Sequence, residues 1–65
     1  MTLGEKIRGL RKKQGLSQED VSRKINISRQ AVSKWEQDLV VPDTVNLMKL
    51  CECFGITLAE LTGDV

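Results

Sequence analysis

The sequence predicts an all-α fold, a compact bundle of five short helices, in one domain that spans residues 1–65. Apolar residues recur at spacings of three and four along the chain, as on the buried faces of helices, and no segment alternates as a half-buried strand does. Residues that can cap helices precede these segments, and Gly or Asn follows several of them. A chain of 65 residues buries a modest core, so we expect limited stability unless a partner adds to it.

The first helix is expected to begin near Leu3 and to end at Gly15. Thr2 and Glu5 form a capping box, in which each side chain satisfies the backbone N–H of the other residue. Gly commonly follows the last turn of a helix. The basic run 11–13 allows two interpretations, a phosphate contact or a solvated helix end where cations are favoured, and we prefer the second for its two lysines. The apolar stripe of this helix consists of Leu3, Ile7 and Leu10.

Residues 18–36 predict a helix, a tight turn and a second helix. Ser17 can cap the first of these helices and Ser28 the second. Asn26 lies between them, and Asn tolerates the left-handed backbone of a tight turn better than most residues other than Gly. Helical spacing directs two apolar pairs to the interior, Val21 with Ile25 and Val32 with Trp35.

This segment resembles the helix-turn-helix of the lambda-repressor-like family, the Cro/CI or XRE class of DNA-binding proteins. In that family the first helix opens with Gln, here Gln18, and the second ends in Glu, here Glu36. Two positions depart mildly from the pattern, because Ser22 stands where Ala is usual and Asn26 where Gly is common. The resemblance extends over residues 3–61 and implies a bacterial or phage transcriptional regulator, in the first place a repressor.

After the motif, residues 37–41 form a connection, and Pro42 precedes a fourth helix that Asp43 or Thr44 caps and that runs to about Phe54. Its predicted buried face consists of Val45, Leu47, Leu50, Cys51 and Phe54, and Gly55 ends it.

A short fifth helix follows, because Thr57 and Glu60 form another capping box. Leu58 and Leu61 are expected to point inward, and Gly63 closes the helix.

The charge of the chain is polarised although its net value is only +1. Residues 1–35 carry nine Lys/Arg and three Asp/Glu, a net charge of +6, whereas residues 36–65 carry one Lys and six Asp/Glu, a net charge of −5. The basic part contains the helix-turn-helix, as expected for nucleic-acid binding. The alternative is that this uneven distribution of charge arose by chance, as it often does in small helical domains. No apolar run is long enough to cross a bilayer and no secretory signal is present, so we expect a cytoplasmic protein.

The chemistry-bearing residues argue against an enzyme. The chain has no His, no Gly-rich phosphate loop and no Ser or Cys with a plausible base. Cys51 and Cys53 are two apart in a helix and point to different sides, so we expect free thiols, the first of them in the core, and neither a disulfide nor a metal site. We expect no cofactor and no small-molecule ligand.

The resemblance implies that helix 28–37 enters the major groove of double-stranded DNA, with its N-terminal residues at base edges. Polar side chains on its outer face then read bases, and the amides at the start of the preceding helix form a phosphate site. The alternative for these side chains is a merely solvated face. The predicted base-reading residues are Ser28, Arg29, Gln30, Ser33 and Lys34, and the predicted phosphate contacts are Arg11, Ser17, Gln18 and Gln37.

Arg11 and Trp35 each have a structural interpretation beside a role in binding. In similar proteins the Arg that corresponds to Arg11 pairs with the Glu at the end of the recognition helix, so the resemblance implies an ion pair between Arg11 and Glu36. Trp35 could stack on an unpaired base, but it shares a face with Val32, and we favour a place in the core.

One such domain contacts few base pairs, and relatives commonly read palindromic operators as homodimers. Candidate dimer contacts are Val40, Val41, Leu58, Leu61 and Val65. Two alternative functions remain: the chain is the DNA-binding part of a longer regulator or an antitoxin, or it is a protein-interaction module with the same fold.

Overall fold

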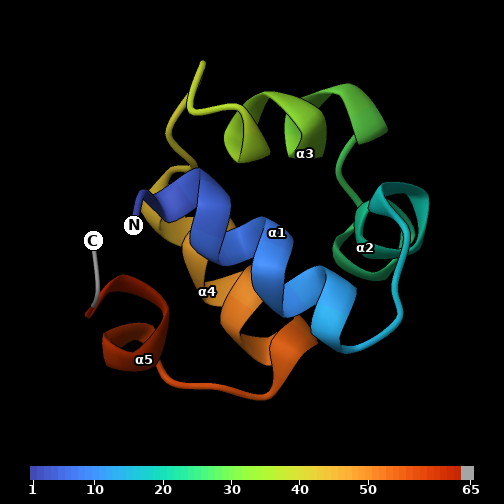
Figure 1. Cartoon of the computed structure of the whole chain (residues 1–65). Helices are drawn as coiled ribbons and strands as arrows, with labels where there is room; N and C mark the ends of the chain where they lie inside the picture. The colour runs from blue at the N-terminus through green and yellow to red at the C-terminus, as the bar shows by residue number, and fades with distance from the viewer. Residues whose placement is uncertain (64–65) are drawn as a thin grey trace.

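The computed structural model describes residues 1–63 and confirms the all-α prediction (Figure 1). No strand occurs among these residues. The helices follow one another in the order α1 (Leu3–Lys13), α2 (Gln18–Ile25), α3 (Arg29–Glu36), α4 (Thr44–Phe54) and α5 (Leu58–Thr62).

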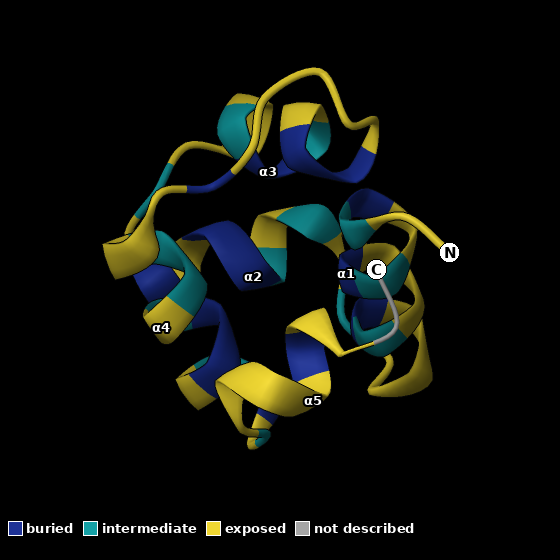
Figure 2. Cartoon of the chain, turned by 90° about the vertical axis from the view of Figure 1, so that its left-hand side faces the viewer, coloured by how far each residue is buried: buried dark blue, intermediate teal, exposed yellow. Residues whose placement is uncertain are grey.

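The helices enclose one core. α1 packs against α3 and α5, α2 packs against α3 and α4, and α4 also contacts α5. Buried segments face the interior of the bundle, while the outer faces of the helices are exposed (Figure 2). The buried apolar residues are Ile7, Val21, Ile25, Val32, Trp35, Leu50, Cys51, Phe54 and Leu61. Among residues 1–63, every buried side-chain nitrogen or oxygen has a hydrogen-bond partner.

Local capping explains where the helices begin and end. The predicted capping boxes at Thr2 and Thr57 are present, and a third forms at Ser17. Asp43 caps α4, with its Oδ1 accepting from the Asn46 N–H at 2.8 Å. Asn26 adopts the expected left-handed conformation, at φ 58° and ψ 46°, which turns the chain from α2 into α3.

Two predicted burials are wrong. Val45 is 62% exposed, because it lies five residues before Leu50 and so about 140° round the helix from the buried face of α4. Leu58 is 45% exposed, since α5 has little more than one turn and docks through Leu61. Leu61 itself is fully buried, so the prediction that it forms a surface contact in a dimer is wrong. Val65 lies outside the described residues.

The start of α1 docks tightly against the end of α3. The Gly4 N–H donates to Asp38 Oδ1 at 2.9 Å, and the Thr2 hydroxyl donates to Asp38 Oδ2 at 2.6 Å. A Cβ on Gly4 would lie 2.5 Å from the Trp35 carbonyl oxygen and 2.7 Å from that of Glu36. No local pattern in the sequence indicates a role for Gly4 or for Asp38, yet both residues fix how α3 packs on α1.

We predict that Gly4→Ala lowers the free energy of unfolding by about 1–3 kcal/mol, because the new methyl group would overlap backbone oxygens that cannot move independently. The matched control is Gly9→Ala in the same helix, where a Cβ meets nothing within 4 Å. There the better helix propensity of Ala should raise the free energy of unfolding by about 0.5–1 kcal/mol. Urea unfolding of both variants measures the difference, and equal effects would contradict the close docking.

Candidate nucleic-acid interface

One side of α3 is buried and the other is free. Val32 is fully buried and Trp35 is only 4% exposed, so the prediction that Trp35 belongs to the core is confirmed. Ser28 caps the helix, because its Oγ accepts from the Ala31 N–H at 3.1 Å. The Ser28 hydroxyl hydrogen remains available for a donor role outward.

The structure brings the predicted base-reading residues onto the outer side of α3. Arg29, Gln30 and Lys34 are exposed, and none of their side chains makes a hydrogen bond or ion pair within residues 1–63. Ser33 is half-buried at the edge of the same side. Three long polar side chains of different hydrogen-bonding character therefore project together, as recognition of a base-pair edge requires.

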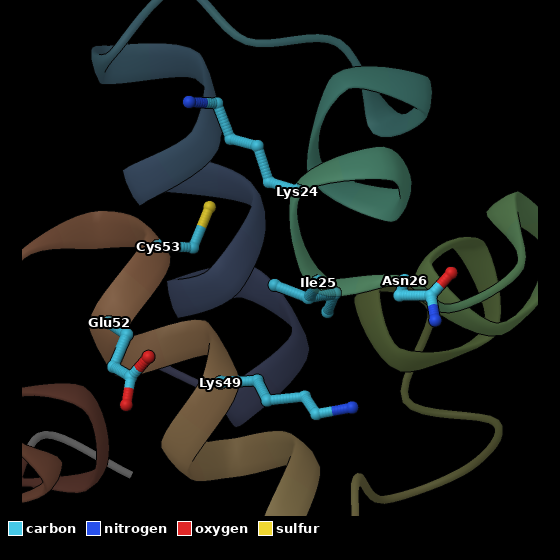
Figure 3. A pocket seen from close by; sticks show the side chains of 6 residues that line it. All are labelled: Lys24, Ile25, Asn26, Lys49, Glu52 and Cys53. Carbon is cyan, nitrogen blue, oxygen red and sulfur yellow. The ribbon is translucent and has the colours of Figure 1, made fainter.

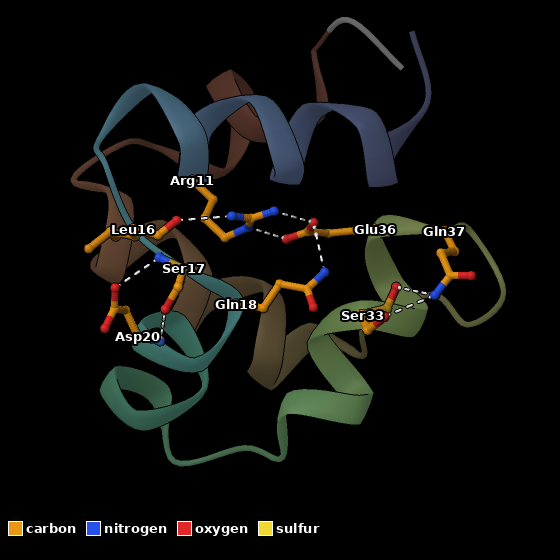
Figure 4. A network of polar contacts seen from close by, with 8 residues as sticks. All are labelled: Arg11, Leu16, Ser17, Gln18, Asp20, Ser33, Glu36 and Gln37. Carbon is orange, nitrogen blue, oxygen red and sulfur yellow. Dashed lines mark hydrogen bonds and ion pairs between the residues drawn. The ribbon is translucent and has the colours of Figure 1, made fainter.

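Gln37 folds back on Ser33 (Figure 4). Its Nε2 donates to Ser33 Oγ at 2.9 Å and to the Ser33 carbonyl oxygen at 3.2 Å. Because Ser33 Oγ accepts here, its own hydrogen can still be donated to an acceptor outside the helix. The Gln37 contact thus fixes the direction of Ser33, which sequence reasoning treated as an independent residue.

The predicted ion pair between Arg11 and Glu36 is present and buried, with side chains 11% and 3% exposed. Arg11 Nε donates to Glu36 Oε2 at 2.7 Å, and Nη2 donates to Oε1 at 2.9 Å (Figure 4). The third nitrogen, Nη1, donates to the Leu16 carbonyl oxygen at 2.9 Å. Hydrogen bonding to Glu36 raises the pKa of Arg11, although burial opposes this, so the guanidinium stays charged.

Gln18 joins the same carboxylate. Its Nε2 donates to Glu36 Oε1 at 3.2 Å, so α1, α2 and α3 meet at one side chain (Figure 4). This bond positions the half-buried Gln18 at the start of α2, where the first backbone N–H groups lack partners within the helix. The geometry suits an anion there.

Ser17 and Asp20 close the start of α2. Ser17 Oγ accepts from the Asp20 N–H at 2.9 Å, and the Ser17 N–H donates to Asp20 Oδ2 at 2.8 Å. These bonds to Ser17, followed by the bond from Arg23, lower the pKa of Asp20. Asp20 therefore remains ionised at the start of α2, and Arg23, 3.0 Å from its carboxylate, offsets the negative charge.

Arg11 differs from the other predicted phosphate contacts. Its side chain is almost enclosed and each of its three nitrogens already donates within the protein. This arrangement favours a structural role, and the phosphate contact of Arg11 stays a prediction.

A cleft of about 520 Å³ lies between the end of α2 and α4 (Figure 3). Burial raises the pKa of the Cys53 thiol against the opposing effect of Lys24, so this thiol stays protonated near neutral pH. Both cysteines are free, as predicted, with Cys51 in the core. Within residues 1–63 no group of His, Cys, Asp and Glu side chains could hold a metal ion, and no helix is long and apolar enough to cross a membrane. The cleft is lined by Lys24, Ile25, Asn26, Lys49, Glu52 and Cys53.

Comparison with known proteins places this geometry in a family. Residues 7–61 match the family model described as "Helix-turn-helix", and the chain belongs to that family. It is 33% identical to the HTH-type transcriptional regulator ImmR of Bacillus subtilis (strain 168) over 97% of this chain and 50% of that protein. It is 34% identical to the HTH-type transcriptional activator BcrR of Enterococcus faecalis over 94% of this chain and 30% of that protein. The chain thus spans half or less of the length of these relatives.

The fold agrees with a solved repressor. The crystal structure of the P22 c2 repressor protein in complex with a synthetic operator superimposes with a TM-score of 0.89. The alignment covers 94% of this chain and 92% of that chain at 30% sequence identity. The five-helix arrangement predicted from the lambda-repressor-like resemblance is therefore confirmed.

We predict that Arg11→Ala lowers the free energy of unfolding by about 3–5 kcal/mol, because it leaves the buried Glu36 carboxylate without its cation. Arg23→Ala is the matched control, since it removes an exposed pair with Asp20 and should cost less than about 1 kcal/mol. Thermal unfolding followed by circular dichroism measures both. An unchanged melting temperature for Arg11→Ala would refute the importance of the buried pair.

Proposed function

We propose that the chain is a sequence-specific regulator of transcription that binds double-stranded DNA and inserts α3 with its caps, residues 28–37, into the major groove. The observation that carries the proposal is the outer side of α3, where the side chains of Arg29, Gln30 and Lys34 project without partners in residues 1–63. The likeness to a repressor bound to its operator supports it, because the two chains align over almost their whole length.

Each base-reading role follows from the chemistry of the side chain. Gln30 presents one donor and one acceptor, the pattern that pairs with the N6 and N7 atoms of adenine. Arg29 and Lys34 donate to guanine O6 and N7, or to phosphate. Ser28 and Ser33 each retain a hydroxyl hydrogen for either kind of base edge.

The proposed phosphate contacts flank the groove-binding helix. At the start of α2, the Gln18 side chain and the free backbone N–H groups offer donors to one phosphate, with the Ser17 hydroxyl beside them. At the end of α3, the Gln37 amide would donate to another phosphate by releasing one of its two bonds to Ser33. Arg11 contributes here only through the hydrogens that its bonds to Glu36 and Leu16 leave available.

In this proposal the protein binds a palindromic operator as a homodimer. It acts in the cytoplasm and has no catalytic activity. Repression is the regulatory effect that we assign. It needs only occupancy of the DNA, whereas activation also needs a surface that contacts the transcription machinery. The ImmR and BcrR relatives are about two and three times as long as the matched region, and further domains in a longer regulator would be compatible with the same DNA-binding role.

Selection from a random pool of duplex DNA at near-physiological salt tests the proposal. We expect enrichment of an inverted repeat whose half-site centres lie about one helical turn, roughly 34 Å, apart. Weak, strongly salt-dependent binding without enrichment would contradict sequence-specific recognition. That outcome would favour the alternative, in which the outer face of α3 binds another protein.

We predict that Gln30→Ala relaxes base preference at one position of each selected half-site, with a loss of discrimination of about 1–3 kcal/mol. Gln18→Ala is the control, because Gln18 contacts no proposed base-reading residue and loss of a phosphate contact should weaken binding about equally on all sequences. Fluorescence anisotropy on the selected duplex and on single-base variants separates the two effects. Unchanged preference in Gln30→Ala would remove this assignment.

A further inference from the structure

The end of α3 carries a pair of polar side chains whose hydrogen bond has a fixed direction. The Nε2 atom of Gln37 lies 2.9 Å from Ser33 Oγ and 3.2 Å from the Ser33 carbonyl oxygen (Figure 4). A carbonyl oxygen can only accept a hydrogen bond, so the nitrogen of the Gln37 amide must face Ser33 and its oxygen must face away. The Ser33 hydroxyl is therefore the acceptor in this pair.

Only one of the two side-chain bonds is needed to hold the pair. The Ser33 carbonyl oxygen already accepts from the Gln37 backbone N–H at 3.1 Å, so release of the side-chain bond would not leave this oxygen unpaired. The bond to the carbonyl oxygen is also the longer of the two. Gln37 can therefore donate one N–H to a phosphate while its other N–H stays on Ser33 Oγ.

The bond from Gln37 makes the Ser33 hydroxyl a donor toward the outside. Among residues 1–63 no group accepts its hydrogen, and Ser33 lies half-buried at the edge of the outer side of α3. A hydroxyl that accepts one hydrogen bond is polarised by it and donates more strongly. If Ser33 accepted from a base as well, its oxygen would accept twice and its own hydrogen would lack a partner, which costs free energy.

Ser33 belongs to a row of side chains that donate. Arg29, Ser33 and Gln37 follow one another at intervals of four, so they lie along one line of the helix. A guanidinium only donates, and the bond from Gln37 gives Ser33 the same character. In the major groove guanine presents two acceptors and thymine presents one, whereas cytosine presents only an amino donor. A fixed donor at Ser33 therefore distinguishes guanine and thymine from cytosine.

We propose that Gln37 determines base specificity through Ser33, because its side-chain N–H holds the Ser33 hydroxyl as a donor that selects guanine or thymine over cytosine. This inference deepens the proposed function and rests on it. Gln37 is a positioning residue in this role, since it acts on the base through Ser33. Without the N–H of Gln37, the Ser33 hydroxyl can turn to serve a donor or an acceptor on the base, and the selection is lost.

Fluorescence anisotropy on the selected duplex and its single-base variants tests this coupling. Ser33→Ala first identifies the base that Ser33 faces, as the position where discrimination against cytosine falls. At that position Gln37→Ala should lower the discrimination by about threefold to tenfold, the worth of one hydrogen bond. In the Ser33→Ala background, Gln37→Ala should cause no further loss there. Gln37→Glu places an acceptor beside Ser33, so it should lose the discrimination or shift it toward cytosine.

Gln18→Ala is the matched control, because Gln18 contacts no proposed base-reading residue and its loss should weaken binding about equally on all duplexes. Ser33 and Gln37 lie outside the core, so the variants should fold, which circular dichroism verifies.

The inference is overturned if Gln37→Ala weakens binding uniformly, as the control does, or if Ser33→Ala changes the preference at no position. It is also overturned if Gln37→Ala has the same effect on discrimination with and without the Ser33 hydroxyl. In each of these cases a selected sequence still upholds the proposed function. If the unaltered protein selects no sequence, the proposed function fails and this inference fails with it.

Discussion

The fold depends on one buried carboxylate, that of Glu36. It accepts two hydrogen bonds from Arg11 of α1 and one from Gln18 of α2, while its own backbone ends α3. A buried carboxylate without such donors would be strongly destabilising, so the three helices must approach in the one arrangement that satisfies it. Because apolar residues of similar volume often fill such a space at similar or lower cost in free energy, we infer that the pair contributes more to the specificity of the arrangement than to net stability.

This constraint matters because α3 has only eight residues. A helix of that length is marginal in water on its own, and its shape and position must come from tertiary contacts. Val32 and Trp35 pack one side of α3 into the core. Glu36 bonds the end of the helix to α1 and α2, and Asp38, two residues further on, accepts hydrogen bonds from the start of α1. On the outer side, the side chains of Arg29, Gln30 and Lys34 make no contact that the fold requires, so they are available to read a ligand.

Most of the fold could be predicted because its signals are local. The signals that act within a few residues are the capping boxes, the left-handed Asn26 and the helical spacing of apolar residues. Each of them correctly predicted where a helix begins, ends or runs. The failures concern relations between elements. Val45 and Leu58 are apolar and near the predicted stripes, but which side of a short helix meets the core depends on how it docks. Asp38 and Gly4 form a hydrogen bond although they are 34 positions apart in the sequence, and no local pattern predicts such a contact. The Arg11–Glu36 pair was foreseen only through the family resemblance.

The polarised charge of the chain now has a structural explanation. Its basic half supplies α3 and the start of α2, the surfaces proposed to meet bases and phosphates, and its acidic half supplies the segment that follows α3, with Asp38 and Asp43. Negative charge on that segment disfavours its approach to phosphates, so the charge distribution would help to orient the domain on DNA. A uniformly basic domain would gain affinity for any DNA but would lose this discrimination between its two surfaces. A net charge close to zero is therefore compatible with specific DNA binding, because the distribution of the charge matters more than its sum.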